Sequence, residues 1–316
     1  MSEAPLIPPT AASLQHALDA ALGLPVQIRH RKPNLYAGHF PSEIVTCRLS
    51  TGATRRFFCK YGGPYVDEVH ATKGGVAYEA RVYQTILAPL QIPAPAFVGS
   101  TTDPATNHTW LILDYLPAAA QLHPTESTLV LVAQYLADLH RRTAPSIHAW
   151  PFLQRLDAAD YRAWAERAAR YSAPYAADFP WLAPLCRAFA TRLAPLLDSP
   201  PSLIHGECYR QNTLLLNNRI LAVDWESAAI APGLIDLATL VDCWPDDSIA
   251  PCVCAYQSAR WPAPASAPPN FSETFDLARL YLHLRWLGDR PDWTTPEHLH
   301  ERAPFLRTLA HRLAIR

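Results

Sequence analysis

The segment that decides the fold is Leu203–Asp236, which has the sequence LIHGECYRQNTLLLNNRILAVDWESAAIAPGLID. Two short apolar stretches lie near its middle, Thr213–Leu216 and Ile220–Val223. Between them stand Asn217 and Asn218, and asparagine readily adopts the backbone conformations of a tight turn. The pattern predicts a β-hairpin, with polar residues directly before its first strand and directly after its second.

The polar residues at the open end of this hairpin are suited to chemistry. Paired strands would bring Asn212 beside Asp224, and an amide oxygen next to a carboxylate is a ligand set that Mg²⁺ accepts together with water and substrate phosphates. Glu207, five residues before Asn212, follows an apolar strand and a glycine turn, where it could take a proton from a hydroxyl. Each residue alone would be an ordinary turn or strand-end polar group. Together they predict a catalytic site of Glu207, Asn212 and Asp224, with Asn212 and Asp224 on the metal.

The two motifs HGECYRQN and VDWE resemble the catalytic segment of the aminoglycoside phosphotransferase and choline kinase-like enzymes. These enzymes are relatives of the protein kinases and carry a His-Gly-Asp-x-x-x-x-Asn loop. The resemblance implies that Glu207 replaces the catalytic-base aspartate, that Asn212 and Asp224 bind Mg²⁺, that His205 supports the loop, and that Asp236 braces it. The chain is therefore an HGE variant, in which the base has one more methylene than aspartate.

The resemblance also implies partners elsewhere in the chain. Only three of the 27 basic residues are lysines, and one of them, Lys60, ends the apolar stretch RRFFCKY. A kinase-like fold needs such a strand lysine to hold the nucleotide phosphates, and a glutamate on the next helix, here Glu79, to pair with it. Arg210, inside the loop, is a candidate to approach the transferred phosphate, although an arginine at such a position is more often a surface residue. Glu226 would assist the metal or orient Arg210.

Two further segments match the positions where such enzymes contact the nucleotide. Residues 36–43 (YAGHFPSE) lie between the first two expected strands, and Gly38 and Ser42 are candidates for phosphate contacts, although no G-x-G-x-x-G motif is present. The run LILDYLP resembles the family's hinge, in which Asp114, Tyr115 and Leu116 would pair with the adenine edge through their backbone.

The order of elements predicts a sheet with one interrupting helix, followed by a helical lobe with a small β insertion, and the resemblance implies that this is an α+β, two-lobed protein kinase-like fold. The small β-rich N-lobe, residues 1–116, would hold a five-stranded sheet and a helix, and the mainly helical C-lobe, residues 117–316, would hold the catalytic loop. Alternating and helical hydrophobic periodicities place the elements. Strands are expected at 26–30, 43–49, 54–61, 97–99, 110–115, 203–204, 213–216 and 220–223, and helices at 13–22, 74–87, 127–140, 158–171, 185–197 (broken at Pro195), 275–287 and 303–315.

Composition limits the partners. The chain has 316 residues with a formal net charge of −1, which removes the electrostatic argument for nucleic acid or an anionic membrane as the main partner. No apolar run approaches the roughly 20 residues that cross a bilayer. No signal peptide is visible, and the seven scattered cysteines predict reduced thiols. A soluble, cytoplasmic protein is expected.

The predicted function is ATP- and Mg²⁺-dependent transfer of phosphate to a hydroxyl of a small molecule. Acidic and aromatic residues of the later helices could bind a cationic amine or amino sugar; an uncharged sugar or polyol fits the sequence equally well. These candidate acceptor residues are Asp242, Trp244, Asp246, Tyr281 and Trp286. The alternatives are a nucleotide-binding pseudokinase without phosphotransfer and, less favoured because no G-x-S-x-G motif is present, a hydrolase.

Overall fold

The chain divides into two compact units in this computed structural model, which describes residues 10–34, 40–63, 74–123, 125–263 and 267–315. Unit 1 comprises Met1–Leu122 and Gln211–Ser227, and unit 2 comprises His123–Arg210 and Ala228–Arg316. The contacts thus group Gln211–Ser227, which the sequence division assigned to the C-lobe, with the N-terminal residues. The division into lobes at residues 116 and 117 stays a prediction.

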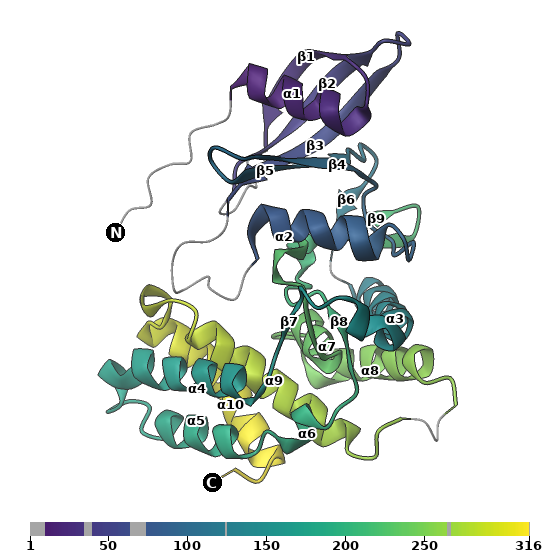
Figure 1. Cartoon of the computed structure of the whole chain (residues 1–316). Helices are drawn as coiled ribbons and strands as arrows, with labels where there is room; N and C mark the ends of the chain where they lie inside the picture. The colour runs from purple at the N-terminus through teal and green to yellow at the C-terminus, as the bar shows by residue number, and fades with distance from the viewer. Residues whose placement is uncertain (1–9, 35–39, 64–73, 124, 264–266, 316) are drawn as a thin grey trace. The chain divides into compact units, whose positions relative to one another are not determined.

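Unit 1 is built on a five-stranded antiparallel sheet (Figure 1). Its spatial order is β1-β2-β3-β5-β4, so that β3, which carries Lys60, is the central strand. The strands are β1 (Val26–Pro33), β2 (Ser42–Leu49), β3 (Thr54–Gly62), β4 (Phe97–Asp103) and β5 (His108–Asp114).

The two faces of this sheet have different roles because successive side chains of a strand point to opposite sides. One face carries apolar residues such as Val45, Phe57 and Ile112, which pack against α1 (Ala11–Leu22) in one buried cluster. The other face carries Lys60, whose side chain contacts α2 (Gly75–Val82). The predicted single helix 74–87 is therefore α2 followed by a π-helical turn, Tyr83–Leu87.

The predicted hairpin is present and forms a second sheet of unit 1. Strands β9 (Thr213–Leu216) and β10 (Arg219–Ala222) are antiparallel, and β6 (Ala120–Gln121) pairs with the free side of β9. Asn217 and Asn218 have φ angles of 48° and 60°, the left-handed values that a type I′ turn requires at both central residues.

Unit 2 is mainly helical around a small three-stranded sheet of order β7-β11-β8 (Figure 1). Side-chain caps at Thr125, Asp157 and Thr295 satisfy the first amide groups of α3, α4 and α10. The strands are β7 (Gln154–Arg155), β8 (Pro201–Ile204) and β11 (Ala229–Pro232), and the helices are α3 (Glu126–Thr143), α4 (Ala158–Ser172), α5 (Leu182–Thr191), α6 (Ala194–Leu197), α7 (Leu234–Leu240), α8 (Asp246–Arg260), α9 (Phe271–Leu287) and α10 (Pro296–Arg312).

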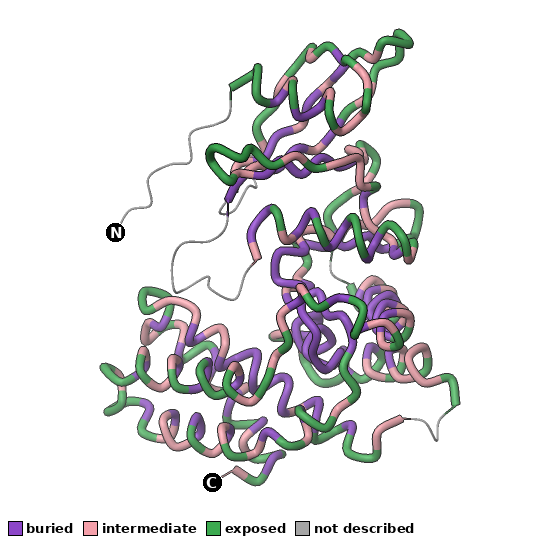
Figure 2. The backbone as a smooth tube through the Cα atoms, viewed as in Figure 1, coloured by how far each residue is buried: buried purple, intermediate pink, exposed green. Residues whose placement is uncertain are grey.

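Two helices of unit 2 were not expected from the sequence. All seven residues of α7 are buried (Figure 2), so its sequence shows no amphipathic periodicity. Helix α8 begins at Asp246, inside a stretch that reads as a loop, and it contains Pro251. Among the described residues, no helix is both long and apolar enough to cross a membrane.

Candidate active site

Three carboxylates surround Lys60 in unit 1. Its ammonium donates hydrogen bonds to Glu79 at 2.8 Å, to Asp224 at 2.6 Å and to Glu226 at 3.1 Å. Glu79 comes from α2, and the other two carboxylates follow β10. The sheet, the helix and the hairpin therefore each contribute to one cluster within the same unit.

The cluster is buried, and burial governs its electrostatics. The side chains of Glu79 and Glu226 are 3% and 5% exposed, whereas that of Asp224 is 37% exposed. Burial alone would lower the pKa of Lys60, but the three carboxylates outweigh it and raise that pKa well above its ordinary value. Burial raises the pKa of Glu79, with Lys60 opposing it and the neighbouring carboxylates adding to it. Within the contacts given for the described residues, three carboxylates share the Lys60 ammonium.

The hairpin fixes the two predicted metal ligands. The amide of Val223 donates to the carbonyl of Asn212 at 2.9 Å, which extends the strand pairing by one step, so that Asp224 directly follows the residue paired with Asn212. Asp224 has a φ of 68°, an uncommon value for a residue with a side chain and one that tends to occur at functional sites. The next amide, of Trp225, donates to Glu79 Oε1 at 3.2 Å and ties this turn to α2.

A cavity of about 810 Å³ opens beside the cluster, and the described residues that line it all belong to unit 1. Lys60, Asn212 and Asp224 lie on its wall. Apolar side chains of the sheet, including Phe58 and Leu113, line it as well. The volume is in the range that holds a drug-sized or cofactor-sized ligand, about 300–1,000 Å³.

The predicted nucleotide contacts are distributed as follows. Asp114, Tyr115 and Leu116 line the cavity at the end of β5, and the Asp114 carboxylate is paired with Arg55. Ser42 also lines the cavity, and its hydroxyl accepts a hydrogen bond from Asn34 at 3.0 Å. Gly38 lies outside the described residues.

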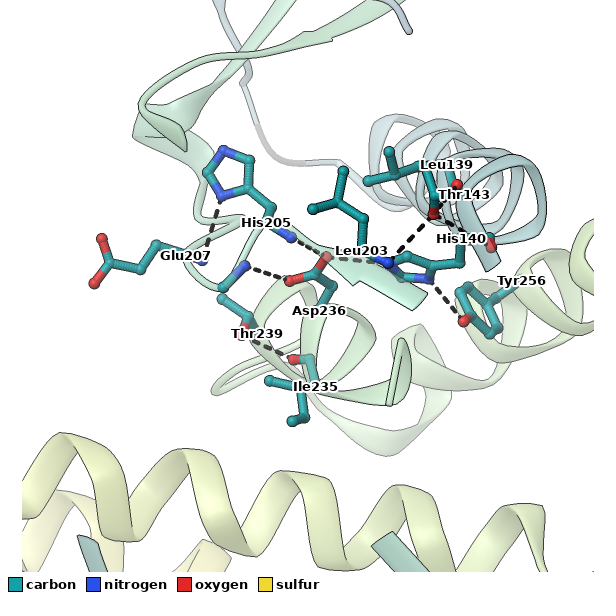
Figure 3. A network of polar contacts seen from close by, with 11 residues as sticks. Leu139, His140, Thr143, Leu203, His205, Glu207, Ile235, Asp236, Thr239 and Tyr256 are labelled. Atoms are coloured by element: carbon teal, nitrogen blue, oxygen red, sulfur yellow. Dashed lines mark hydrogen bonds and ion pairs between the residues drawn. The ribbon is translucent and has the colours of Figure 1, made fainter. Parts of the chain in front are cut away.

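In unit 2 the His205-Gly206-Glu207 segment is held by Asp236 (Figure 3). The amides of His205 and Gly206 donate to the two oxygens of Asp236 at 2.7 and 2.8 Å. His140, from α3, contacts the same carboxylate through Nε2 at 3.1 Å. Burial alone would raise the pKa of Asp236, but the hydrogen bonds from His140 and the backbone outweigh it and lower that pKa below its ordinary value.

The tautomer of His140 follows from these contacts. Burial lowers the pKa of His140, so the ring is neutral, and its Nε2 must donate to the Asp236 carboxylate. Its Nδ1 then accepts from the hydroxyl of Tyr256 at 2.9 Å. Sequence reasoning found Asp236 but missed His140 and Tyr256, because nothing in the sequence links these distant positions to the loop.

The Glu207 side chain extends away from Asp236 (Figure 3). Its amide donates to His205 Nδ1 at 3.3 Å, which gives His205 a contact within the loop. Its carboxylate accepts from Arg285 at 3.0 Å, a partner that the sequence did not indicate. Arg210, in the following 3₁₀ turn, is exposed, and Glu226 contacts Lys60 in the structure.

Most candidate acceptor residues are engaged with the protein itself. Arg302 donates to both oxygens of Asp242, at 2.8 and 3.1 Å, and lies 4.3 Å above the Trp286 ring. Asp246 is paired with Arg312. Tyr281 is buried edge-to-face against another tyrosine, and Trp244 is partly buried.

The model of the phosphotransferase enzyme family matches residues 46–269 of this chain. The chain belongs to that family. The match confirms the predicted phosphotransferase, and it covers Lys60, Glu79 and the whole Leu203–Asp236 segment. No curated protein sequence matches the chain significantly.

Several solved structures share this fold. The choline kinase LicA from Streptococcus pneumoniae has a TM-score of 0.59 at 12% identity and covers 95% of this chain and 98% of its own. The macrolide 2'-phosphotransferase MphH from Brachybacterium faecium has a TM-score of 0.57 at 20% identity, covering 93% and 97%. An aminoglycoside 2'-phosphotransferase in complex with GDP has a TM-score of 0.64 at 10% identity, covering 96% and 98%. These likenesses confirm the predicted α+β, kinase-like fold.

Proposed function

We propose that this phosphotransferase uses ATP and Mg²⁺ to phosphorylate a hydroxyl group of a small molecule. The observation that carries the proposal is the buried contact of Lys60 with Glu79 and Asp224 on the wall of a cofactor-sized cavity. Phosphoryl transfer depends on positioning and charge neutralisation more than on covalent help from the protein. A buried lysine held by a helix glutamate supplies both.

In this proposal the nucleotide occupies the cavity of unit 1. The base would lie against apolar side chains such as Phe58 and Leu113 and pair with the backbone of Asp114–Leu116, while Lys60 holds the phosphates. Two of the structural neighbours were solved with nucleotides, LicA with AMP and the aminoglycoside enzyme with GDP. ATP is the choice that matches the resemblance to the kinases.

The donor set fits magnesium. Oxygens of Glu79, Asp224 and Glu226 lie within 4.8 Å of one another, and only oxygen ligands are offered, as a hard cation prefers. We assign Asn212 and Asp224 as the residues that hold it, because both border the cavity and the Asp224 side chain is 37% exposed, whereas that of Glu79 is 3% exposed. When bound, Mg²⁺ would neutralise charge on the phosphates.

Glu207 is the proposed base. It would accept a hydrogen bond from the acceptor hydroxyl and take its proton as the phosphoryl group leaves ADP. The pairing of Asp242 with Arg302 and of Asp246 with Arg312 neutralises two of the acidic groups that were candidates for binding a cation. An uncharged sugar or polyol is therefore favoured over an amine as the acceptor.

The test is a screen of sugars, polyols and hydroxylated amines with ATP and MgCl₂, followed by ADP release and phosphorylated product. Asp224→Ala should abolish turnover, and Glu207→Gln should lower kcat by roughly 10²- to 10⁴-fold with the KM for ATP unchanged. Arg48→Met, an exposed cation on β2, is the control and should retain activity. Full turnover by Asp224→Ala would exclude the metal site.

Direct nucleotide binding separates the kinase from a pseudokinase. Calorimetry with ATP and MgCl₂ should show binding that Lys60→Met weakens strongly. Binding of ATP that Lys60→Met weakens, without phosphorylated product for any acceptor, would favour the pseudokinase.

A further inference from the structure

Arg285 in α9 binds the segment that carries Glu207 at two adjacent residues. Its Nη1 donates to the carbonyl of Gly206 at 2.7 Å, and its Nη2 donates to Glu207 Oε1 at 3.0 Å. The side chains of Arg285 and Glu207 are each only 16% exposed. A guanidinium presents its donors in a fixed plane, so two bonds to neighbouring residues fix backbone and side chain together.

The Gly206 residue is consequently held from both sides. Its amide donates to Asp236 at 2.8 Å, and its carbonyl accepts from Arg285. Gly206 has a φ of 82°, a left-handed value that glycine adopts readily. Opposite charges on α7 and α9 therefore hold one turn of the backbone, and Glu207 is the next residue.

Glutamate at the base position creates a need for this restraint. It has one more rotatable bond than aspartate, so its carboxylate samples more positions unless a partner selects one. We propose that Arg285 is a positioning residue that holds the Glu207 carboxylate in its working place and so allows glutamate to serve at this position. The catalytic part of this inference rests on the proposed function, whereas the restraint of the loop does not.

The charge of Arg285 is secure. Burial alone would lower its pKa, but Glu207 and the neighbouring Tyr281 outweigh burial and raise it above the ordinary value. The guanidinium therefore stays protonated beside the base across the working pH range. A fixed positive charge also favours the ionised form of a carboxylate next to it.

The test compares Arg285→Gln and Arg285→Lys with Arg167→Gln. Arg167, on α4, is a matched control because it is also an arginine near Trp164, at 4.3 Å from the ring compared with 5.9 Å for Arg285, and it binds the Asp289 carbonyl. Hydrogen exchange of the peptide containing residues 203–209 reports on the loop without requiring activity. Arg285→Lys keeps the charge and keeps the test decisive if Arg285→Gln does not fold.

We expect faster exchange of this peptide in Arg285→Gln, a kcat lowered by roughly 10- to 100-fold, and an unchanged KM for ATP. The exchange rate and the kcat of Arg285→Lys should lie between those of Arg285→Gln and the wild type, because an ammonium cannot reproduce the two planar hydrogen bonds of a guanidinium. The acid limb of the kcat–pH profile should move to higher pH in Arg285→Gln. Arg167→Gln should match the wild type in exchange of this peptide and in kcat.

A double variant tests whether Arg285 acts through Glu207. If it does, Glu207→Gln and Glu207→Gln/Arg285→Gln should have the same kcat within about threefold, because Glu207→Gln alone already removes the carboxylate through which Arg285 acts. Multiplied losses in the double variant, or unchanged exchange in Arg285→Gln, would overturn the inference. If Glu207→Gln leaves turnover intact, the proposed base is wrong; faster exchange in Arg285→Gln would still support the restraint of the loop.

Discussion

Replacing Lys60 with methionine is the sharpest perturbation of unit 1. Methionine has a similar length but no charge, so it leaves Glu79, Asp224 and Glu226 within 4.8 Å of one another without their common cation. Two of these carboxylates are almost fully buried, so water cannot replace the interaction with Lys60 that they lose.

The magnitude follows from the burial of each partner. Removing one partner of a buried ion pair costs about 3–5 kcal/mol, and this range applies to Glu79 and Glu226. An exposed pair is worth about 0–1 kcal/mol, and this smaller range applies to the more exposed Asp224. The melting temperature of the transition that includes unit 1 should fall by roughly 10 °C.

The pH dependence has a definite sign. Burial raises the pKa of Glu79, so the folded state binds protons more strongly than the unfolded state, and stability declines as pH rises above the ordinary carboxyl pKa of 4.5. Lys60→Met removes the cation that opposes this effect. Its stability should therefore decline more steeply between pH 5 and pH 8 than that of the wild type.

The assay is calorimetric or fluorescence-detected melting of Lys60→Met, with Arg48→Met as the control, at pH 5, 6.5 and 8. Lys60→Met/Glu79→Gln should regain part of the lost stability, because it removes one of the crowded carboxylates. MgCl₂ should stabilise Lys60→Met more than the wild type. A loss below about 1 kcal/mol with no dependence on pH would refute the buried ion cluster.

Three further perturbations test unit 2. Burial lowers the pKa of His283 to about 3, and its Nδ1 accepts a hydrogen bond from Arg302, so that below pH 6.5 the unfolded state alone gains a proton at this residue. Urea unfolding should show that the free energy of unfolding falls by about 2 kcal/mol between pH 6.5 and pH 5, and by less in His283→Asn. Gly206→Ala should cost roughly 1–2 kcal/mol because of its left-handed φ, and it should lower kcat as well, which steady-state kinetics would detect. Gly233→Ala would place a Cβ 2.4 Å from His140 Nδ1, so thermal melting should show a loss of about 1–3 kcal/mol; an unchanged melting temperature would contradict this packing.

The parts of the structure that sequence could predict depend on local pattern. The Asn217-Asn218 turn is specified by two neighbouring residues, and the hairpin follows from the apolar stretches on either side. Lys60 stands out because lysine is rare in this chain and because an apolar strand leads to it. The kinase-like resemblance then indicated Glu79, and the structure places it 2.8 Å from the Lys60 ammonium.

The parts that could not be predicted depend on long-range contacts. Arg285 is 78 residues away from Glu207, and it is one of many arginines without a distinguishing neighbour. Asp242 resembles a ligand for a cationic substrate until Arg302, on α10, is seen to neutralise it. Helix α7 is buried on every side, so periodicity carries no information about it.

The division of the chain into two units limits how the protein can be cut. The backbone passes from one unit to the other after Leu122, after Arg210 and after Ser227, so neither unit is a continuous piece of sequence. A fragment that stopped at residue 122 would lack β9 and β10, and with them Asp224 and Glu226. Such a fragment would keep Lys60 and Glu79 but lose two of the three carboxylates of the cluster. Exchange of N-terminal halves between relatives would therefore separate Lys60 from the proposed metal ligands, and a grafted N-terminal half must bring Gln211–Ser227 with it.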